Sequence, residues 1–86
     1  MPHEFRWIEW NREKVARHGV SPAEAEQVVR GARRPYPRQN GKGKWLVIGR
    51  GRGNRVVEVV YLVDPDDTLF IIHAMPLTTR RRRGGR

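Results

Sequence analysis

The 86-residue sequence contains no cysteine, which excludes disulfide bonds and thiolate metal sites. It also has no apolar run near the roughly 20 residues that cross a bilayer. The first residues, Met1 to Phe5, lack the basic and apolar regions of a signal peptide. These absences predict a cytoplasmic protein that makes no contact with membranes.

Acidic residues are missing from one long part of the chain. Residues 30–55 contain no Asp or Glu. They contain nine Lys or Arg residues: Arg30, Arg33, Arg34, Arg38, Lys42, Lys44, Arg50, Arg52 and Arg55. A block of one sign over this length attracts polyanions. With the net charge of +9, it predicts RNA contacts at Arg33, Arg34, Arg38, Lys42, Lys44, Arg52 and Arg55.

A second basic block, Arg80 to Arg83 with Arg86, closes the sequence. We expect one domain over residues 1–79 and a disordered, Arg-rich tail over residues 80–86, because neighbouring like charges repel each other. Removing the tail should leave the melting temperature nearly unchanged and weaken nucleic-acid binding, with a shallower dependence of affinity on salt. A large drop in melting temperature would show instead that the tail packs on the domain.

Residue patterns predict two helices followed by strands. Asn11 is a good N-cap for a helix that ends at His18, and Ser21 with Glu24 has the spacing of a capping box for a second helix. The predicted fold is α+β, with two N-terminal helices packed on a three- to four-stranded antiparallel sheet. The strands are expected over residues 44–48, 55–63 and 68–74, with an extended edge segment near residues 34–38.

Two histidines are candidates for acid–base chemistry. His18 either ends the first helix, where a cation is favoured, or moves protons. His73 lies in phase with Leu69 and Ile71 on the last expected strand. It is therefore either a half-buried polar residue or an acid or base.

Other polar features allow both structural and functional interpretations. Glu58 either faces solvent or meets the basic block, and Tyr61 either packs in the core or stacks on a base. The glycines at 49, 51 and 53 match no nucleotide-binding fingerprint and indicate a hairpin turn. Because the three histidines are far apart in the sequence and lack carboxylates at ligand spacing, we expect no metal and no cofactor.

Several short motifs, in their order, resemble the BrnT-like toxin family, the ribonuclease toxins of type II toxin–antitoxin systems. The resemblance covers nearly the whole chain, and its most specific part is a helix, His-Gly-Val-Ser and a second helix. The family pattern has Ser-Ala-Arg where this chain has His73-Ala74-Met75. The matching segments are Trp10-Asn11 with Lys14, Arg17 to Ser21, Glu24-Ala25 with Val28, Ile48 to Arg50, Val56 to Tyr61, and Ile71 to Ala74 with Leu77-Thr78.

This resemblance implies a RelE-like fold, a cognate antitoxin that covers a basic cleft, and metal-independent cleavage of free or ribosome-bound RNA. Cleavage would proceed by attack of the ribose 2′-hydroxyl on the adjacent phosphate. The resemblance implies catalytic roles for Lys14, His18 and Arg50, and chemistry adds His73 and Tyr61 as groups that move a proton. Two alternatives stay open: a nucleic-acid-binding protein without catalysis, and a protein whose basic face binds an acidic partner.

Overall fold

The computed structural model describes residues 3–77, which form two helices and a four-stranded antiparallel sheet. This confirms the predicted α+β class, whereas the predicted tail over residues 80–86 lies outside the described residues. In chain order the elements are α1 (Glu9–Ala16), α2 (Pro22–Arg30), β1 (Arg38–Gln39), β2 (Lys44–Arg50), the 3₁₀ helix η1 (Arg52–Asn54), β3 (Val56–Val63) and β4 (Leu69–Pro76).

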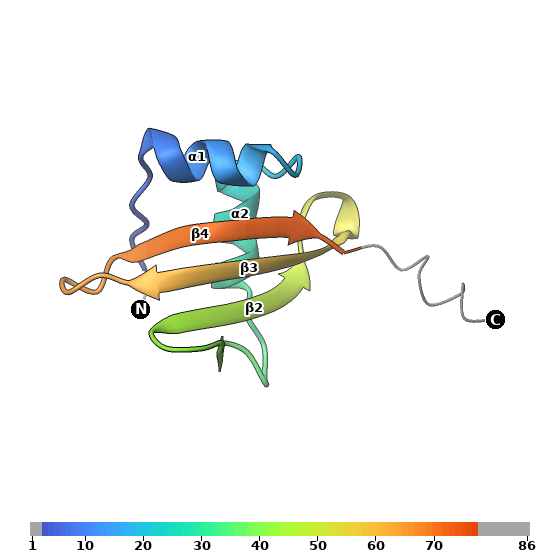
Figure 1. Cartoon of the computed structure of the whole chain (residues 1–86). Helices are drawn as coiled ribbons and strands as arrows, with labels where there is room; N and C mark the ends of the chain where they lie inside the picture. The colour runs from blue at the N-terminus through green and yellow to red at the C-terminus, as the bar shows by residue number, and fades with distance from the viewer. Residues whose placement is uncertain (1–2, 78–86) are drawn as a thin grey trace.

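The strands follow one another across the sheet in the order β1-β2-β3-β4. Helix α2 covers one face of the sheet, and α1 lies along β4 at its edge (Figure 1). The face turned away from α2 is called the open face below. No helix within residues 3–77 is long and apolar enough to cross a membrane.

The hydrophobic core lies between α2 and the sheet. Side chains alternate along β3, so Val57, Val59 and Tyr61 point toward α2 and are buried. Their register partners Val47 on β2 and Ile71 on β4 are buried with them. The helices complete this core with Val15, Ala25, Val28 and Val29, and Val20 joins it from the turn between them.

The N-cap of the first helix lies three residues earlier than predicted. Ile8, in extended backbone, is the N-cap, so the expected cap at Asn11 is wrong. The buried Asn11 side chain lies in the first turn, where its Oδ1 accepts from the Ile8 N–H at 2.7 Å. Its Nδ2 donates to the carbonyls of Arg6 (3.1 Å) and Ile71 (3.0 Å). The Asn11 amide can be buried because its oxygen and nitrogen are both hydrogen-bonded, to backbone groups at the start of α1 and at the edge of β4.

A β-bulge in β4 changes the direction of His73. The register changes from Tyr61 opposite Ile71 to Val60 opposite His73, so Ile72 is an extra residue. His73 therefore shares the open face with Val60. The prediction that it lies in phase with Ile71 is wrong, because strict alternation does not hold across a bulge.

The second helix begins as predicted, but its carboxylate has another partner. Ser21 Oγ accepts from the Glu24 N–H at 3.1 Å, which confirms the N-cap. The buried Glu24 side chain accepts from Arg52 N–H (2.9 Å), Arg55 Nε (2.8 Å) and Arg55 Nη2 (2.6 Å). The expected capping-box role of Glu24 is wrong because charge-assisted bonds to an arginine are stronger than one bond to a backbone N–H.

Gly51 leaves the space that Glu24 occupies. A methyl group at Gly51 would lie within 3.0 Å of both Cγ and Cδ of Glu24. Gly51→Ala should therefore lower the free energy of unfolding by about 1–3 kcal/mol, measured by urea denaturation. Gly49→Ala is the control, since its methyl would meet Val28 at an ordinary 3.6 Å. Equal losses in the two variants would contradict this account.

Acid should weaken the connection between Glu24 and Arg55. The hydrogen bonds from Arg55, assisted by the Arg52 N–H, hold the pKa of Glu24 below its ordinary value against the opposing effect of burial. When the pKa of a carboxyl group is lower in the folded protein than in the unfolded chain, the ionised group stabilises the fold. This stabilisation is complete above the pKa in the unfolded chain, about 4.3, and is lost as the pH falls through the pKa in the folded protein.

We therefore expect the melting temperature of the wild-type protein to fall more steeply below about pH 4 than that of Glu24→Gln. Thermal unfolding between about pH 2 and pH 7 measures this difference. Parallel curves for the two proteins would show that Glu24 does not carry the acid sensitivity.

Candidate functional site

The open face carries a histidine–carboxylate pair. His73 Nε2 on β4 lies 2.8 Å from Glu58 Oε2 on β3, and both side chains are about one-third exposed. Their positions follow from the register, which places His73 opposite Val60 and Glu58 opposite Met75. Glu58 therefore meets a histidine rather than the basic block, and a substrate can reach both groups.

A second histidine comes from the connection between the helices. His18 is exposed, and its ring centroid lies 6.0 Å from that of His73, with the rings edge to face. Helix α1 ends at Ala16, so His18 lies in the following turn rather than at the predicted helix end. Gly19, at φ 75°, supplies the left-handed residue of this turn, and buried Val20 anchors it. Three elements thus bring two imidazoles and one carboxylate together.

Lys14 and Trp10 extend this cluster along α1. Both precede His18 at intervals of four residues, which keeps them on one side of the helix. Lys14 Nζ lies 5.1 Å from the ring centroid of Trp10, which in turn stacks on Phe70 of β4 at 6.0 Å. Lys14 therefore borders the open face one helical turn before His18.

Most of the basic block is unpaired. Within residues 3–77, only Arg30 and Arg55 of its nine members form salt bridges, with Glu26 and Glu24. The other seven are exposed and form none: Arg33, Arg34, Arg38, Lys42, Lys44, Arg50 and Arg52. Surface cations without carboxylate partners remain available to phosphate groups.

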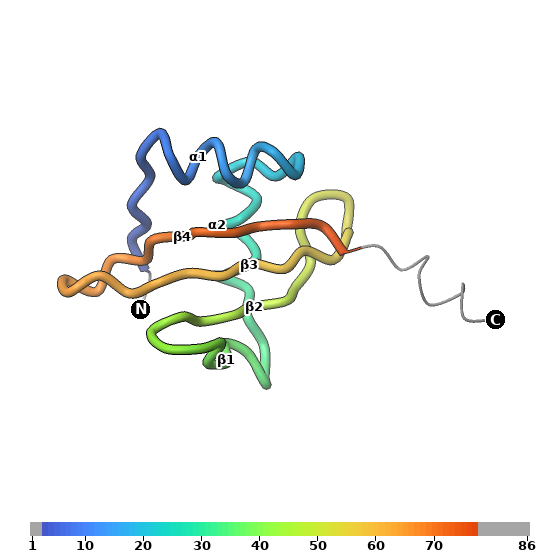
Figure 2. Tube along the Cα trace, in the orientation of Figure 1, coloured from blue at the N-terminus to red at the C-terminus, as the bar shows by residue number. Residues whose placement is uncertain are grey.

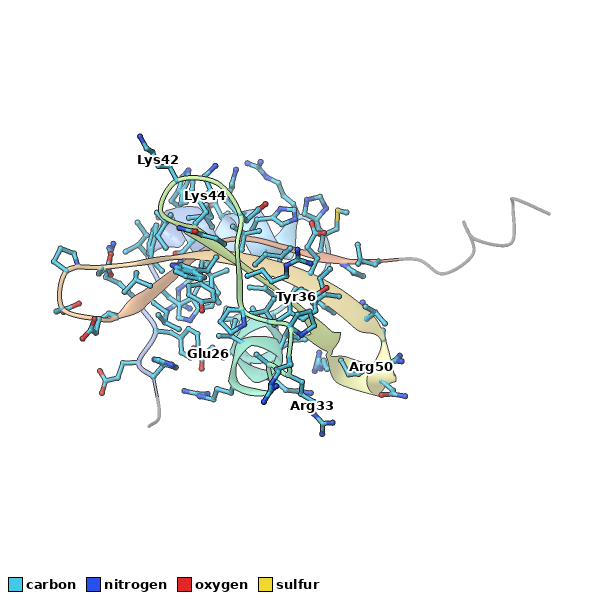
Figure 3. All side chains as sticks on the ribbon, turned by 90° about the horizontal axis from the view of Figure 1, so that it is seen from below. Glu26, Arg33, Tyr36, Lys42, Lys44 and Arg50 are labelled. Carbon is cyan, nitrogen blue, oxygen red and sulfur yellow. The ribbon has the colours of Figure 1, made fainter. Side chains whose placement is uncertain are left out.

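The unpaired cations divide into groups. Figure 3 shows Lys42 and Lys44 near the β1–β2 turn, away from Arg33 and Arg50, which lie beside α2. Arg33 and Arg50 line one hollow of about 470 Å³ together with Val28, Gly31, Ile48 and Gly49. Arg50 thus lies with Arg33, and the structure does not bring it into contact with the histidines.

The remaining predicted basic residues come from three segments. Arg34 lies between α2 and β1, Arg38 lies on β1, and Arg52 lies in η1. The Arg55 guanidinium is held by Glu24 and by the Gly19 carbonyl at 2.9 Å. Arg55 therefore holds the β2–β3 connection onto α2 and the turn before it.

Tyr61 is separated from the histidines by the sheet itself. It is buried on the α2 side, and this burial raises the pKa of its hydroxyl. The residue lines a different hollow of about 490 Å³ that includes His3 and Asp66. Among the predicted catalytic residues, the structure brings His18 and His73 together. Lys14 lies four residues before His18, over the Trp10 ring, whereas Arg50 and Tyr61 line other hollows.

Sequence reasoning missed the contact between Glu58 and His73. Alternation alone places His73 on the α2 side, and only the bulge brings it to the face that carries Glu58. A charged residue within an otherwise apolar strand was the available signal, because such a residue needs a polar partner. Over residues 3–77 no three His, Cys, Asp or Glu side chains are grouped as a metal site requires.

Comparisons with protein families, curated proteins and solved structures give no match for this chain. The fold alone therefore defines the class of this chain, a small α+β protein with an antiparallel sheet. The resemblance to BrnT-like toxins stays a prediction.

Proposed function

We propose that this protein is a metal-independent endoribonuclease of the BrnT-like toxin type, with a RelE-like fold and a cognate antitoxin. The observation that supports the proposal most is the cluster of His18, His73 and Glu58 on the open face. It lies in a protein of net charge +9 with many unpaired surface cations. The cytoplasm is the compartment in which such a protein would meet RNA.

The cluster offers both proton transfers that RNA cleavage needs. His73, held in place by Glu58, removes the proton of the ribose 2′-hydroxyl. The bond between O2′ and phosphorus forms, the bond between phosphorus and O5′ breaks, and His18 gives a proton to the departing O5′. The products are a 2′,3′-cyclic phosphate and a 5′-hydroxyl. The ring centroids lie 6.0 Å apart, so both imidazoles would approach the same phosphodiester group from one side.

Nearby cations complete the site. Lys14 borders the cluster on α1 and can stabilise charge that develops on the phosphoryl oxygens. Leu46, Val60 and His73 are register partners on β2, β3 and β4, so Leu46 lies on the open face with His73. Lys44 comes two residues before Leu46 on the same strand and therefore shares that face. Arg38 is the register partner of Leu46 on the next strand. Phosphates on either side of the cleaved bond would contact these residues.

The experiment is cleavage of single-stranded RNA by the purified protein with EDTA present. We expect fragments that end in 2′,3′-cyclic phosphate, while DNA of the same sequence stays intact because it lacks the attacking hydroxyl. Induced expression in a bacterium should arrest growth and fragment messenger RNA, which also covers cleavage that needs the ribosome. Intact RNA in both tests, with a correctly folded protein, would contradict the proposal.

The seven unpaired cations also support a second candidate, RNA binding without cleavage. This candidate predicts affinity that falls steeply with salt concentration, because released counterions dominate the binding free energy. RNA would remain intact after long incubation. A binding assay titrated with salt, read beside the cleavage assay, separates the two candidates.

A further inference from the structure

Among residues 3–77, no segment pairs with the outer edge of strand β2 along its second half. Strand β1 pairs only with Leu46 and Trp45, so it covers only the first half of β2 (Figure 2). Pro37 directly precedes β1 and has no N–H to continue the ladder. The other edge of the sheet is different, because residues near Phe5 pair with Leu69 and the Asn11 amide binds the Ile71 carbonyl.

The hydrogen-bond pattern identifies the unpaired groups. The Lys44 carbonyl accepts from Asn40 N–H at 2.8 Å on the β1 side, so the even-numbered residues of β2 point their backbone groups outward. The Gly51 N–H donates to the Arg55 carbonyl at 2.7 Å on the β3 side, as the same alternation requires. The backbone groups of Ile48 and Arg50 therefore face outward, and the Arg50 carbonyl has a long contact of 3.5 Å with Gln27 Nε2.

A hollow lies beside this edge and has an apolar floor and a basic rim. Val28 of α2 supplies the apolar surface and the backbone of Ile48 and Gly49 on β2 borders it, whereas Arg33 and Arg50 supply the charge. Its volume of about 470 Å³ has room for several side chains of an extended segment. Neither arginine forms a salt bridge within residues 3–77.

We propose that the outer edge of β2 from Val47 to Arg50 binds an extended acidic peptide segment of a partner protein as a fifth strand. A peptide supplies carbonyl and N–H groups at the spacing that Ile48 and Arg50 present. Its apolar side chains fill the hollow and its carboxylates meet Arg33 and Arg50. RNA offers phosphates to the arginines but no ladder of amide groups to the strand, so the edge favours a peptide. This inference does not depend on the proposed ribonuclease activity.

The test uses the full chain and a synthetic seven-residue peptide that alternates Glu with Val. We expect binding by isothermal calorimetry and slower hydrogen exchange at the Ile48 and Arg50 amides. The same peptide with proline at its central position should bind weakly, because it loses a ladder donor. No protection at these amides, or equal binding of the proline peptide, would overturn the proposal.

Charge variants test the basic rim. Arg33→Glu with Arg50→Glu should weaken peptide binding about tenfold or more, because two attractive pairs become repulsive. Arg12→Glu with Arg17→Glu changes two exposed cations elsewhere by the same total charge, so it is the matched control and should bind as the wild-type protein does. An equal loss in this control would overturn the site, since it would show an effect of net charge alone.

Two further measurements separate this proposal from others. A uridine oligonucleotide should leave the Ile48 and Arg50 amides unprotected, and stronger protection by it than by the peptide would overturn the peptide site. His73→Gln should bind the peptide as the wild-type protein does, whether or not it cleaves RNA. Peptide binding can thus fail while cleavage succeeds, and the reverse.

Discussion

His73→Gln is expected to slow RNA cleavage by about 10²–10⁴-fold, the usual contribution of a general base or acid. Glutamine keeps a polar group near Glu58 but cannot take up a proton at neutral pH. His18→Gln should produce a loss of similar size, since the mechanism needs two proton transfers. Single-turnover cleavage of a labelled RNA measures both losses, and circular dichroism verifies the fold of each variant.

His3→Gln is the matched control, because His3 lies by the separate hollow that also includes Tyr61. It should cleave at the wild-type rate. Glu58→Gln should lower kcat while KM stays unchanged, since Glu58 positions His73 and does not bind RNA in the proposed mechanism. Wild-type rates in both His18→Gln and His73→Gln would remove the two histidines from the mechanism.

Glu24→Gln is expected to be the most damaging of the isosteric substitutions in the core. The carboxylate is fully buried and receives hydrogen bonds from Arg52 and Arg55 on both oxygens. Glutamine places an amide donor against these donors in either orientation. We expect the free energy of unfolding to fall by about 2–3 kcal/mol. That is a large part of the roughly 5–10 kcal/mol available to a small domain.

Two comparisons test this explanation by urea denaturation. Asp64→Asn removes the carboxylate of the more exposed Arg6 pair and should change stability much less. The double variant Glu24→Met with Arg55→Met should lose less stability than the sum of the losses in Glu24→Met and Arg55→Met, because neither charge is left without its partner. Strictly additive losses would show that the two residues do not act as a pair.

The site was only partly predictable. Lys14 and His18 are predictions from the resemblance to BrnT-like toxins, carried by a segment that is local in sequence, a helix followed by a glycine turn. Arg50 is a prediction of the same kind, yet it lies by Arg33 because the end of β2 approaches α2. Tyr61 was a reasonable proton carrier by chemistry, but a central strand has two faces, and sequence alone does not say which one carries the site.

The sequence by itself determined the order of elements, the second helix start at Ser21 and the turns between strands. Those features depend on local backbone preferences and capping, which a few neighbouring residues specify. The tertiary structure decided which distant groups meet. A one-residue bulge brought His73 to Glu58, packing directed Glu24 to Arg55, and the short β1 left half of β2 uncovered. These outcomes depend on register and on competition between partners far apart in the chain, which local preference does not determine.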